Sequence, residues 1–172
     1  KNDGYITDCH STCTVTGSEL VIGGLVGDNG GEIADSSATG SVTGIEDIGG
    51  LVGYNEGTVN RCFATGDVNG EYWIGGLVGY NYPGNIEDSL ATGTVTGYEV
   101  IAGLVGGNEG RIFNSYAGGD VSGDEWIGGF VGDNGGEIIA SYSNGTVTGS
   151  EDAAGGFVGY NWGKIINSFT SG

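Results

Sequence analysis

The chain has 172 residues, of which 40 are glycine and only one, Pro83, is proline. Its 22 carboxylates against four Lys and Arg residues give a formal net charge of −18, which argues against nucleic acid and anionic membranes as partners, because both bind through clustered basic residues. This much glycine is typical of collagen or of disorder, but glycine does not recur at every third position and apolar residues return at fixed spacing, which excludes both.

Nothing in the chain approaches the roughly 20 consecutive apolar residues that a membrane span needs. Membrane insertion is therefore not expected. The start at Lys1 has neither an initiator methionine nor the features of a signal peptide. We expect one repeat domain over residues 1–172, cut from a longer chain.

One block, Gly-Gly-Leu-Val-Gly, recurs with small variations along the whole sequence. A partial first coil covers residues 1–17, and the blocks then start near residues 23, 49, 75, 102, 128 and 155, in steps of 26 or 27 residues. Such a fixed period predicts a solenoid, in which each repeat stacks on its neighbours.

Residues 29–44 show how one unit is built. We expect short strands at the Leu-Val after the double glycine, from Ile33 to Ala38, and around Val42. Glycine and asparagine lie between these strands, and we expect them at corners that need positive φ. The predicted fold is an all-β parallel β-solenoid of about six and a half coils, with 26–27 residues in each coil.

Equivalent positions of successive coils should stack at roughly 4.8 Å and form columns along the axis. Three apolar columns are expected to fill the interior: Leu25, Leu51, Leu77, Leu104, Phe130 and Phe157; Ile6, Ile33, Val59, Ile86, Ile112, Ile138 and Ile165; and Val15, Val42, Val68, Val95, Val121 and Val147. An asparagine column is expected to form a structural ladder, because polar backbone at a buried bend needs hydrogen-bond partners. Its members are Asn29, Asn55, Asn81, Asn108, Asn134 and Asn161.

The repeat resembles the GLUG motif of bacterial extracellular repeat proteins. The resemblance is clearest from Gly103 to Gly106 and on through Asn108, Ile112 and Val121, and it covers essentially the whole chain. It implies a secreted or cell-surface location, since similar repeats occur as accessory modules of adhesins, haemagglutinin-like proteins and cell-surface peptidases. It implies no catalytic residue.

Three cysteines and one histidine fall within the repeat columns. Cys9 and Cys62 share a column two coils apart, which exceeds the roughly 7 Å Cα separation that a disulfide allows. A bridge from Cys9 to Cys13 would tie off the first coil in an oxidising compartment, and this alternative stays open. His10 stands in a column of bulky residues and is expected to fill that position.

Catalysis has little support in the sequence. It offers no paired histidine and nucleophile and no phosphate-binding loop, so we expect no enzyme activity and no cofactor. We expect a non-catalytic extracellular module that acts as an adhesin stalk, a display element or an interaction scaffold. A surface glycan or a host or cell-surface protein would be its partner. Both ends fall in ordinary repeat sequence, so the chain is expected to continue in a longer parent or to stack end to end.

Carbohydrate binding is the main alternative function. Trp73 and Trp126 share a column two coils apart, and flat aromatic faces suit sugar rings. Tyr72 and Glu125 are the neighbours that could complete such a site. The simpler interpretation is that both tryptophans pack against the loop of the adjacent coil.

Two further alternatives rest on polar columns. Carboxylates lie just before each glycine block, and either calcium or plain solvation could offset their repulsion: Glu46, Glu99, Asp124, Glu125, Glu151 and Asp152. Salt adaptation would explain the same charge. Outward threonines such as Thr92, Thr94 and Thr96 would suit an ice-binding face, but Asp67 and Asp120 interrupt their ranks.

Overall fold

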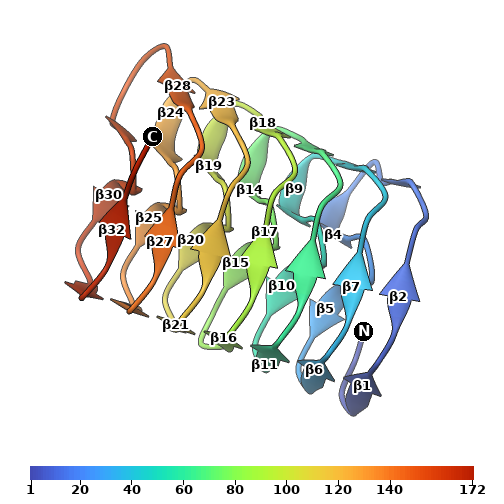
Figure 1. Ribbon diagram of the computed structural model, residues 1–172. Helices are drawn as coiled ribbons and strands as arrows, with labels where there is room; N and C mark the ends of the chain where they lie inside the picture. Colours follow the sequence, from blue (N-terminus) through green and yellow to red (C-terminus); the bar gives the residue numbers. More distant parts are fainter.

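The computed structural model describes residues 1–172 and contains strands but no helix. The chain winds into a stack of similar coils from the N-terminus to the C-terminus (Figure 1). Each complete coil has five short strands, and each strand pairs in parallel with its equivalent in the adjacent coil. The predicted all-β parallel β-solenoid is confirmed. The chain has no helix that is long and apolar enough to cross a membrane.

The strands form five sheets, numbered here by their order along a coil. Sheet 1 contains β1 (Tyr5–Thr7), β6 (Glu32–Ala34), β11 (Thr58–Asn60), β16 (Asn85–Glu87), β21 (Arg111–Phe113), β26 (Glu137–Ile139) and β31 (Lys164–Ile166). Sheet 2 contains β2 (His10–Ser11), β7 (Ser37–Ala38), β12 (Phe63–Ala64), β17 (Leu90–Ala91), β22 (Tyr116–Ala117), β27 (Tyr142–Ser143) and β32 (Phe169–Thr170). Sheet 3 contains β3 (Val15–Thr16), β8 (Val42–Thr43), β13 (Val68–Asn69), β18 (Val95–Thr96), β23 (Val121–Gly123) and β28 (Val147–Gly149).

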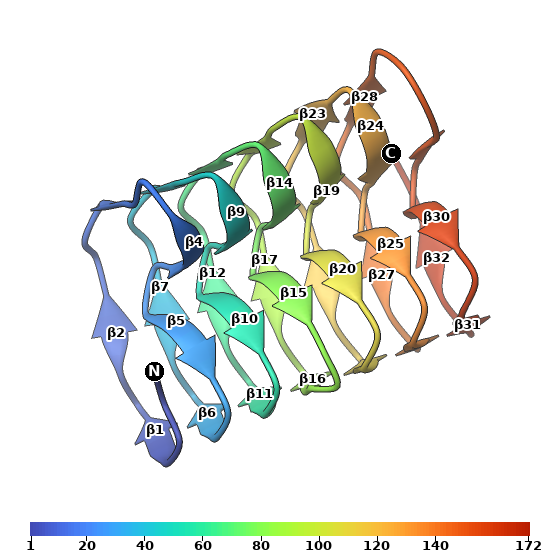
Figure 2. The same cartoon turned by 180° about the vertical axis from the view of Figure 1, so that it is seen from behind.

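The last two sheets lie on one side of the molecule, which faces the viewer in Figure 2. Sheet 4 contains β4 (Leu20–Gly23), β9 (Glu46–Gly49), β14 (Tyr72–Gly75), β19 (Glu99–Ala102), β24 (Glu125–Gly128) and β29 (Ala154–Gly155). Sheet 5 contains β5 (Val26–Asn29), β10 (Val52–Asn55), β15 (Val78–Asn81), β20 (Val105–Asn108), β25 (Val131–Asn134) and β30 (Val158–Asn161).

The prediction of three strands in each coil was wrong. The segment from Ile33 to Ala38 divides into separate strands of sheets 1 and 2, and sheet 4 was not expected. Each of the first five strands of sheet 4 contains a residue with positive φ, such as Asp47 with a φ of 49°. This residue interrupts the period-two alternation by which a strand is recognised in a sequence.

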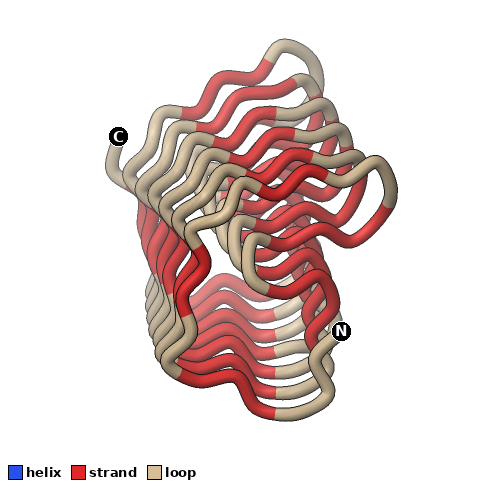
Figure 3. Tube along the Cα trace, turned by 90° about the vertical axis from the view of Figure 1, so that its right-hand side faces the viewer, coloured by secondary structure: helices blue, strands red, loops and turns tan.

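The interior consists of two apolar clusters instead of one. The Leu and first Ile columns fill the larger cluster, with Leu51 and Ile33 fully buried. The Val column packs in the smaller cluster against a second isoleucine column, which the sequence analysis did not single out: Ile22, Ile48, Ile74, Ile101 and Ile127. Figure 3 looks along the axis and shows the cross-section narrowing between two lobes.

Glycine makes the narrow section of each coil possible. A Cβ atom at Gly50 would overlap the carbonyl oxygen of Gly76 and would lie 3.0 Å from Cβ of Ala64 on the opposite wall. Glycine at this point and alanine in sheet 2 therefore let the two walls approach closely. This contact separates the two apolar clusters.

Positive φ is not the reason for the glycines, which corrects a second prediction. No glycine of the chain has positive φ, whereas thirteen other residues do, including Asp35, Arg61 and Trp73. The corner glycines are required by close packing instead. A Cβ atom at Gly66 would overlap the carbonyl oxygen of Gly40 in the preceding coil.

Candidate functional site

The asparagine column forms one continuous ladder along the axis. The side-chain amide of Asn29 donates to Oδ1 of Asn55 at 2.8 Å, and Asn55 donates to Oδ1 of Asn81 at 2.8 Å. The same bond continues through the remaining residues, with Asn2 added at the start: Asn2, Asn29, Asn55, Asn81, Asn108, Asn134 and Asn161. Within the stack these amides are fully buried, so they hold the turn between sheets 5 and 1 and leave no group free for a ligand.

A serine column supports the next turn in the same way. The hydroxyl of Ser89 donates to the carbonyl of Glu87 at 2.7 Å and accepts the N–H of Cys62 at 3.0 Å. Ser115 and Ser141 repeat this pattern. These hydroxyls are therefore engaged in structural bonds.

The sugar-binding set predicted from the sequence divides between two places. The Trp73 ring lies 4.9 Å from the Tyr80 ring, edge to face, and Trp126 stacks on Tyr160 at 5.6 Å, so both indoles point toward sheet 5. Tyr72 instead contacts Tyr98 of the next coil at 6.0 Å. Glu125 pairs in register with Glu99 on the outer edge of sheet 4. Half-buried indoles engaged in this way do not form the open pair of platforms that was expected.

The acidic edge beside sheet 4 gathers like charges. Burial, followed by the nearby charges of Glu99, Glu151, Asp152 and Asp124, raises the pKa of Glu125 above its ordinary value. Glu46 lies further along the same column, in register with Tyr72. No group of three or more His, Cys, Asp and Glu side chains lies close enough together to hold a metal ion. The structure therefore gives the calcium hypothesis no defined site.

Asp47 marks the seam between sheets 4 and 5. Burial, and then the charge of Glu46, raises its pKa from 3.8 to about 6. The pKa of the Tyr54 hydroxyl is also raised, first by burial and then by Glu56 and Asp47. In the first coil, the ammonium of Lys1 lies 3.6 Å from the carboxylate of Asp28.

A hollow of about 420 Å³ opens further along, at the turns from sheet 5 to sheet 1 in the last four coils. Four glycines contribute to its lining: Gly110, Gly135, Gly136 and Gly163. The remaining lining residues are Pro83, Asn85, Glu109, Arg111, Glu137, Trp162 and Lys164. Sequence reasoning missed this site, although the extra residue beside Pro83 lengthens this one turn and was a readable signal.

Comparison with known families gives one result. Residues 18–43, 44–69 and 71–96 each match the model described as the GLUG motif. The chain therefore contains three GLUG repeats across residues 18–96. No curated protein and no solved structure shows significant similarity to it.

Each matched GLUG repeat contains five strands, one from each sheet, as the first shows by running from β4 to β8. Strands β19 to β32 continue the same parallel register beyond the matched residues. Most residues lining the hollow belong to these later coils. A second hollow of about 320 Å³ lies at the same turns in the first three coils, so the later one is distinguished by its lining residues Trp162, Arg111 and Lys164.

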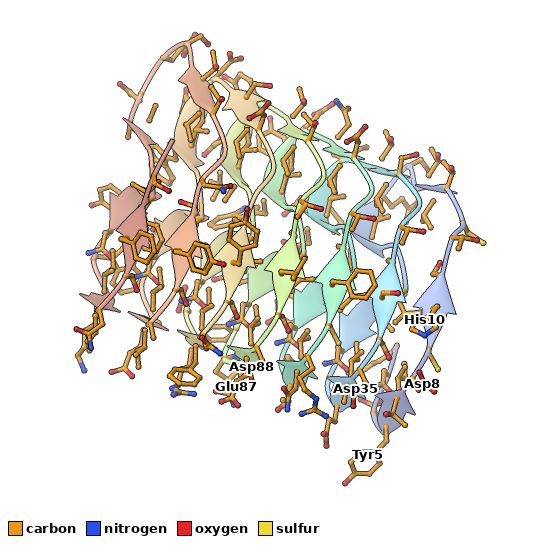
Figure 4. All side chains as sticks on the ribbon, in the orientation of Figure 1. Tyr5, Asp8, His10, Asp35, Glu87 and Asp88 are labelled. Carbon is orange, nitrogen blue, oxygen red and sulfur yellow. The ribbon has the colours of Figure 1, made fainter.

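The three cysteines and the one histidine do not form a common site. Cys9 and Cys13, between which the sequence leaves a bridge open, both have exposed thiols that are unbonded in this structure. Cys13 occupies the same column as Gly40, and its backbone carbonyl oxygen fills the space that a Cβ atom at Gly40 would need. Cys62 is buried. His10 lies beside Asp8 in the first coil, with Nε2 3.5 Å from the carboxylate (Figure 4), and its Nδ1 bonds the Ser37 hydroxyl at 2.8 Å.

Proposed function

We propose that this chain is a non-catalytic repeat module that works outside the cell as an adhesin stalk or display scaffold. The observation that carries the proposal is the unbroken register of five sheets, with the buried amide ladder running through every coil. Such a stack holds its outer columns at fixed spacing and gives a surface that lengthens by one step with each coil.

The engagement of the polar side chains supports a structural role. Asp67 accepts the backbone N–H of Thr94 at 2.9 Å, and Asp120 accepts that of Thr146 at 2.8 Å. The residues that interrupt the threonine ranks thus bond the next coil. Glu87 pairs with Arg111 at 2.7 Å. With serines, asparagines and several carboxylates used to hold coils together, few groups remain for acid–base or nucleophilic chemistry.

A coil duplication tests the scaffold proposal. Inserting a second copy of residues 55–80 after Tyr80 recreates the natural Tyr54–Asn55 junction, so register and both clusters are kept. We expect a folded protein whose maximum dimension in X-ray scattering grows by about 4.8 Å. Deleting the same residues should shorten it equally. An aggregated or unfolded duplication variant would contradict a modular stalk.

The extracellular location is tested separately in cells that make the natural full-length parent. An antibody raised against this module should label intact cells, and external protease should remove the label. Labelling that appears only after the cells are opened would overturn the adhesin proposal. It would leave the rod architecture itself untouched.

A further inference from the structure

The indoles of all three tryptophans lie against sheet 5 or its turns, although Trp73 and Trp126 belong to strands of sheet 4. Trp73 covers Gly107, where a Cβ atom would overlap the indole, and Trp162 covers Gly135 in the same way. Trp126 stacks on Tyr160 of the next coil. Trp73 and Trp162 thus occupy places where a neighbouring coil has no side chain. The hollow lies on this aromatic surface, between Pro83 and Trp162.

The rim of the hollow has a fixed aromatic ring. Trp162 is 61% exposed, and its Nε1 donates to Asp133 at 3.1 Å, which orients the indole while much of its surface stays open. Outside the lining, Tyr80 donates its hydroxyl to the lining residue Glu109 at 2.8 Å and stacks on Tyr82 at 6.2 Å. An aromatic ring held in place loses little conformational freedom when a ligand stacks on it.

The polar groups of the hollow balance one another. Arg111 pairs with Glu87, which lies outside the lining, and Lys164 pairs with the lining residue Glu137 at 2.8 Å. Two of the four basic residues of the chain therefore line this one hollow. Each pair presents both donors and acceptors at a single place, as Asn85 also does.

We propose that this hollow binds a short segment of a neutral oligosaccharide, with the Trp162 indole as the stacking surface. Sugar rings combine a flat apolar C–H face with hydroxyls that donate and accept, which matches an indole beside balanced polar pairs. The volume falls in the range of small-ligand sites. A polyanionic glycan is disfavoured by the charge of −18.

Calorimetry with a panel of neutral gluco-, xylo-, manno- and chito-oligosaccharides tests the proposal on the complete chain. We expect saturable binding by at least one of them, and about a tenfold loss of affinity in Trp162→Ala, as for other central aromatic anchors. Trp162→Tyr should retain most of the affinity. Glu137→Gln, which breaks the pair with Lys164, should weaken binding as well.

Tyr98→Ala is the matched control, because Tyr98 is an exposed aromatic residue beside sheet 4. Its affinity should stay within twofold of the natural chain, and circular dichroism should show each variant folded. The proposal is overturned if no oligosaccharide binds, or if Trp162→Ala and Tyr98→Ala lose affinity equally. None of these results would alter the rod measured for the scaffold proposal.

Discussion

Asp47 is a single side chain whose position sets a measurable pH dependence. Its folded-state pKa of about 6 lies above the ordinary 3.8, so the folded protein favours the protonated form. Below pH 3.8 the carboxyl group is protonated in both the folded and the unfolded chain, so it does not lower the free energy of unfolding. Between pH 3.8 and 6 the unfolded chain ionises first, and above pH 6 the full penalty remains.

We therefore expect Asp47→Asn to stabilise the protein at pH 8 and to have no effect near pH 3. Taken in full, the pKa difference corresponds to about 3 kcal/mol in the free energy of unfolding. We expect a gain of about 1 kcal/mol in Asp47→Asn, because the side chain keeps partial contact with solvent. Urea unfolding at both pH values measures the difference. Asp152→Asn, at an exposed position, removes the same charge at pH 8 and should give a smaller change there. Equal gains in the two variants would mean that net charge, and not burial, is the cause.

The columns of repeated residues could be predicted from the sequence, but the physical cause of each column could not. The glycine columns could be read from the sequence, but their cause was taken to be positive φ. Gly66 is required because a carbonyl from another coil occupies the space of its Cβ atom. A contact between residues 26 apart cannot be recognised until the stacking distance is known. The positive φ of Trp73 could not be predicted either, because the residue at that position is not a glycine.

Among the elements, the amide ladder has the clearest energetic consequence. Asn81 is fully buried, accepts from Asn55, and donates to Asn108 and to the carbonyl of Gly84. Replacing it with alanine leaves buried partners unsatisfied on both sides. Each unsatisfied buried group costs about 1–3 kcal/mol.

We expect Asn81→Ala to lower the free energy of unfolding by about 3 kcal/mol. Asn161→Ala is the control, because Asn161 is an exposed member of the same ladder and bonds only one neighbouring amide. It should cost about 1 kcal/mol or less. Chemical denaturation measures both. A mid-ladder loss no larger than the terminal one would show that the ladder contributes little to stability.

Strand number was the element-level error, and its cause is physical. Sheets 1, 2, 3 and 5 follow apolar columns that the sequence displays directly. Sheet 4 contains the Ile48 column, but the left-handed residue before it, Asp47, breaks the alternation. Turns between parallel coils also leave gaps whose shape depends on neighbours, which is why the hollow beside Trp162 was not foreseen.

For the whole molecule, a net charge of −18 should make stability depend on salt. Glu99 and Glu125 are direct neighbours in sheet 4, so carboxylates repel along the stack. We expect the melting temperature to rise by about 5 °C between low salt and about 0.5 M NaCl, because salt screens the repulsion between carboxylates. Calorimetry across a salt series measures the shift.

The same series separates screening from a calcium site. At matched ionic strength, calcium and sodium chloride should give similar melting temperatures if screening alone acts. A calcium-specific rise at submillimolar concentration, abolished by Glu125→Gln, would contradict this expectation and establish a bound ion. Ion-specific stabilisation is expected only where oxygen ligands converge, and three carboxylates do not converge in this structure.

The amide ladder gives the molecule a polarity. Backbone hydrogen bonds run both ways along the axis, as Leu25 N–H bonds forward to Leu51 and Ser37 N–H bonds back to Cys9. Every ladder amide, in contrast, donates toward the C-terminal coil. Their dipoles add instead of cancelling, so one end of the row presents N–H and the other presents oxygen. The rod therefore has a head and a tail, and copies placed in series would continue this row only when they point the same way.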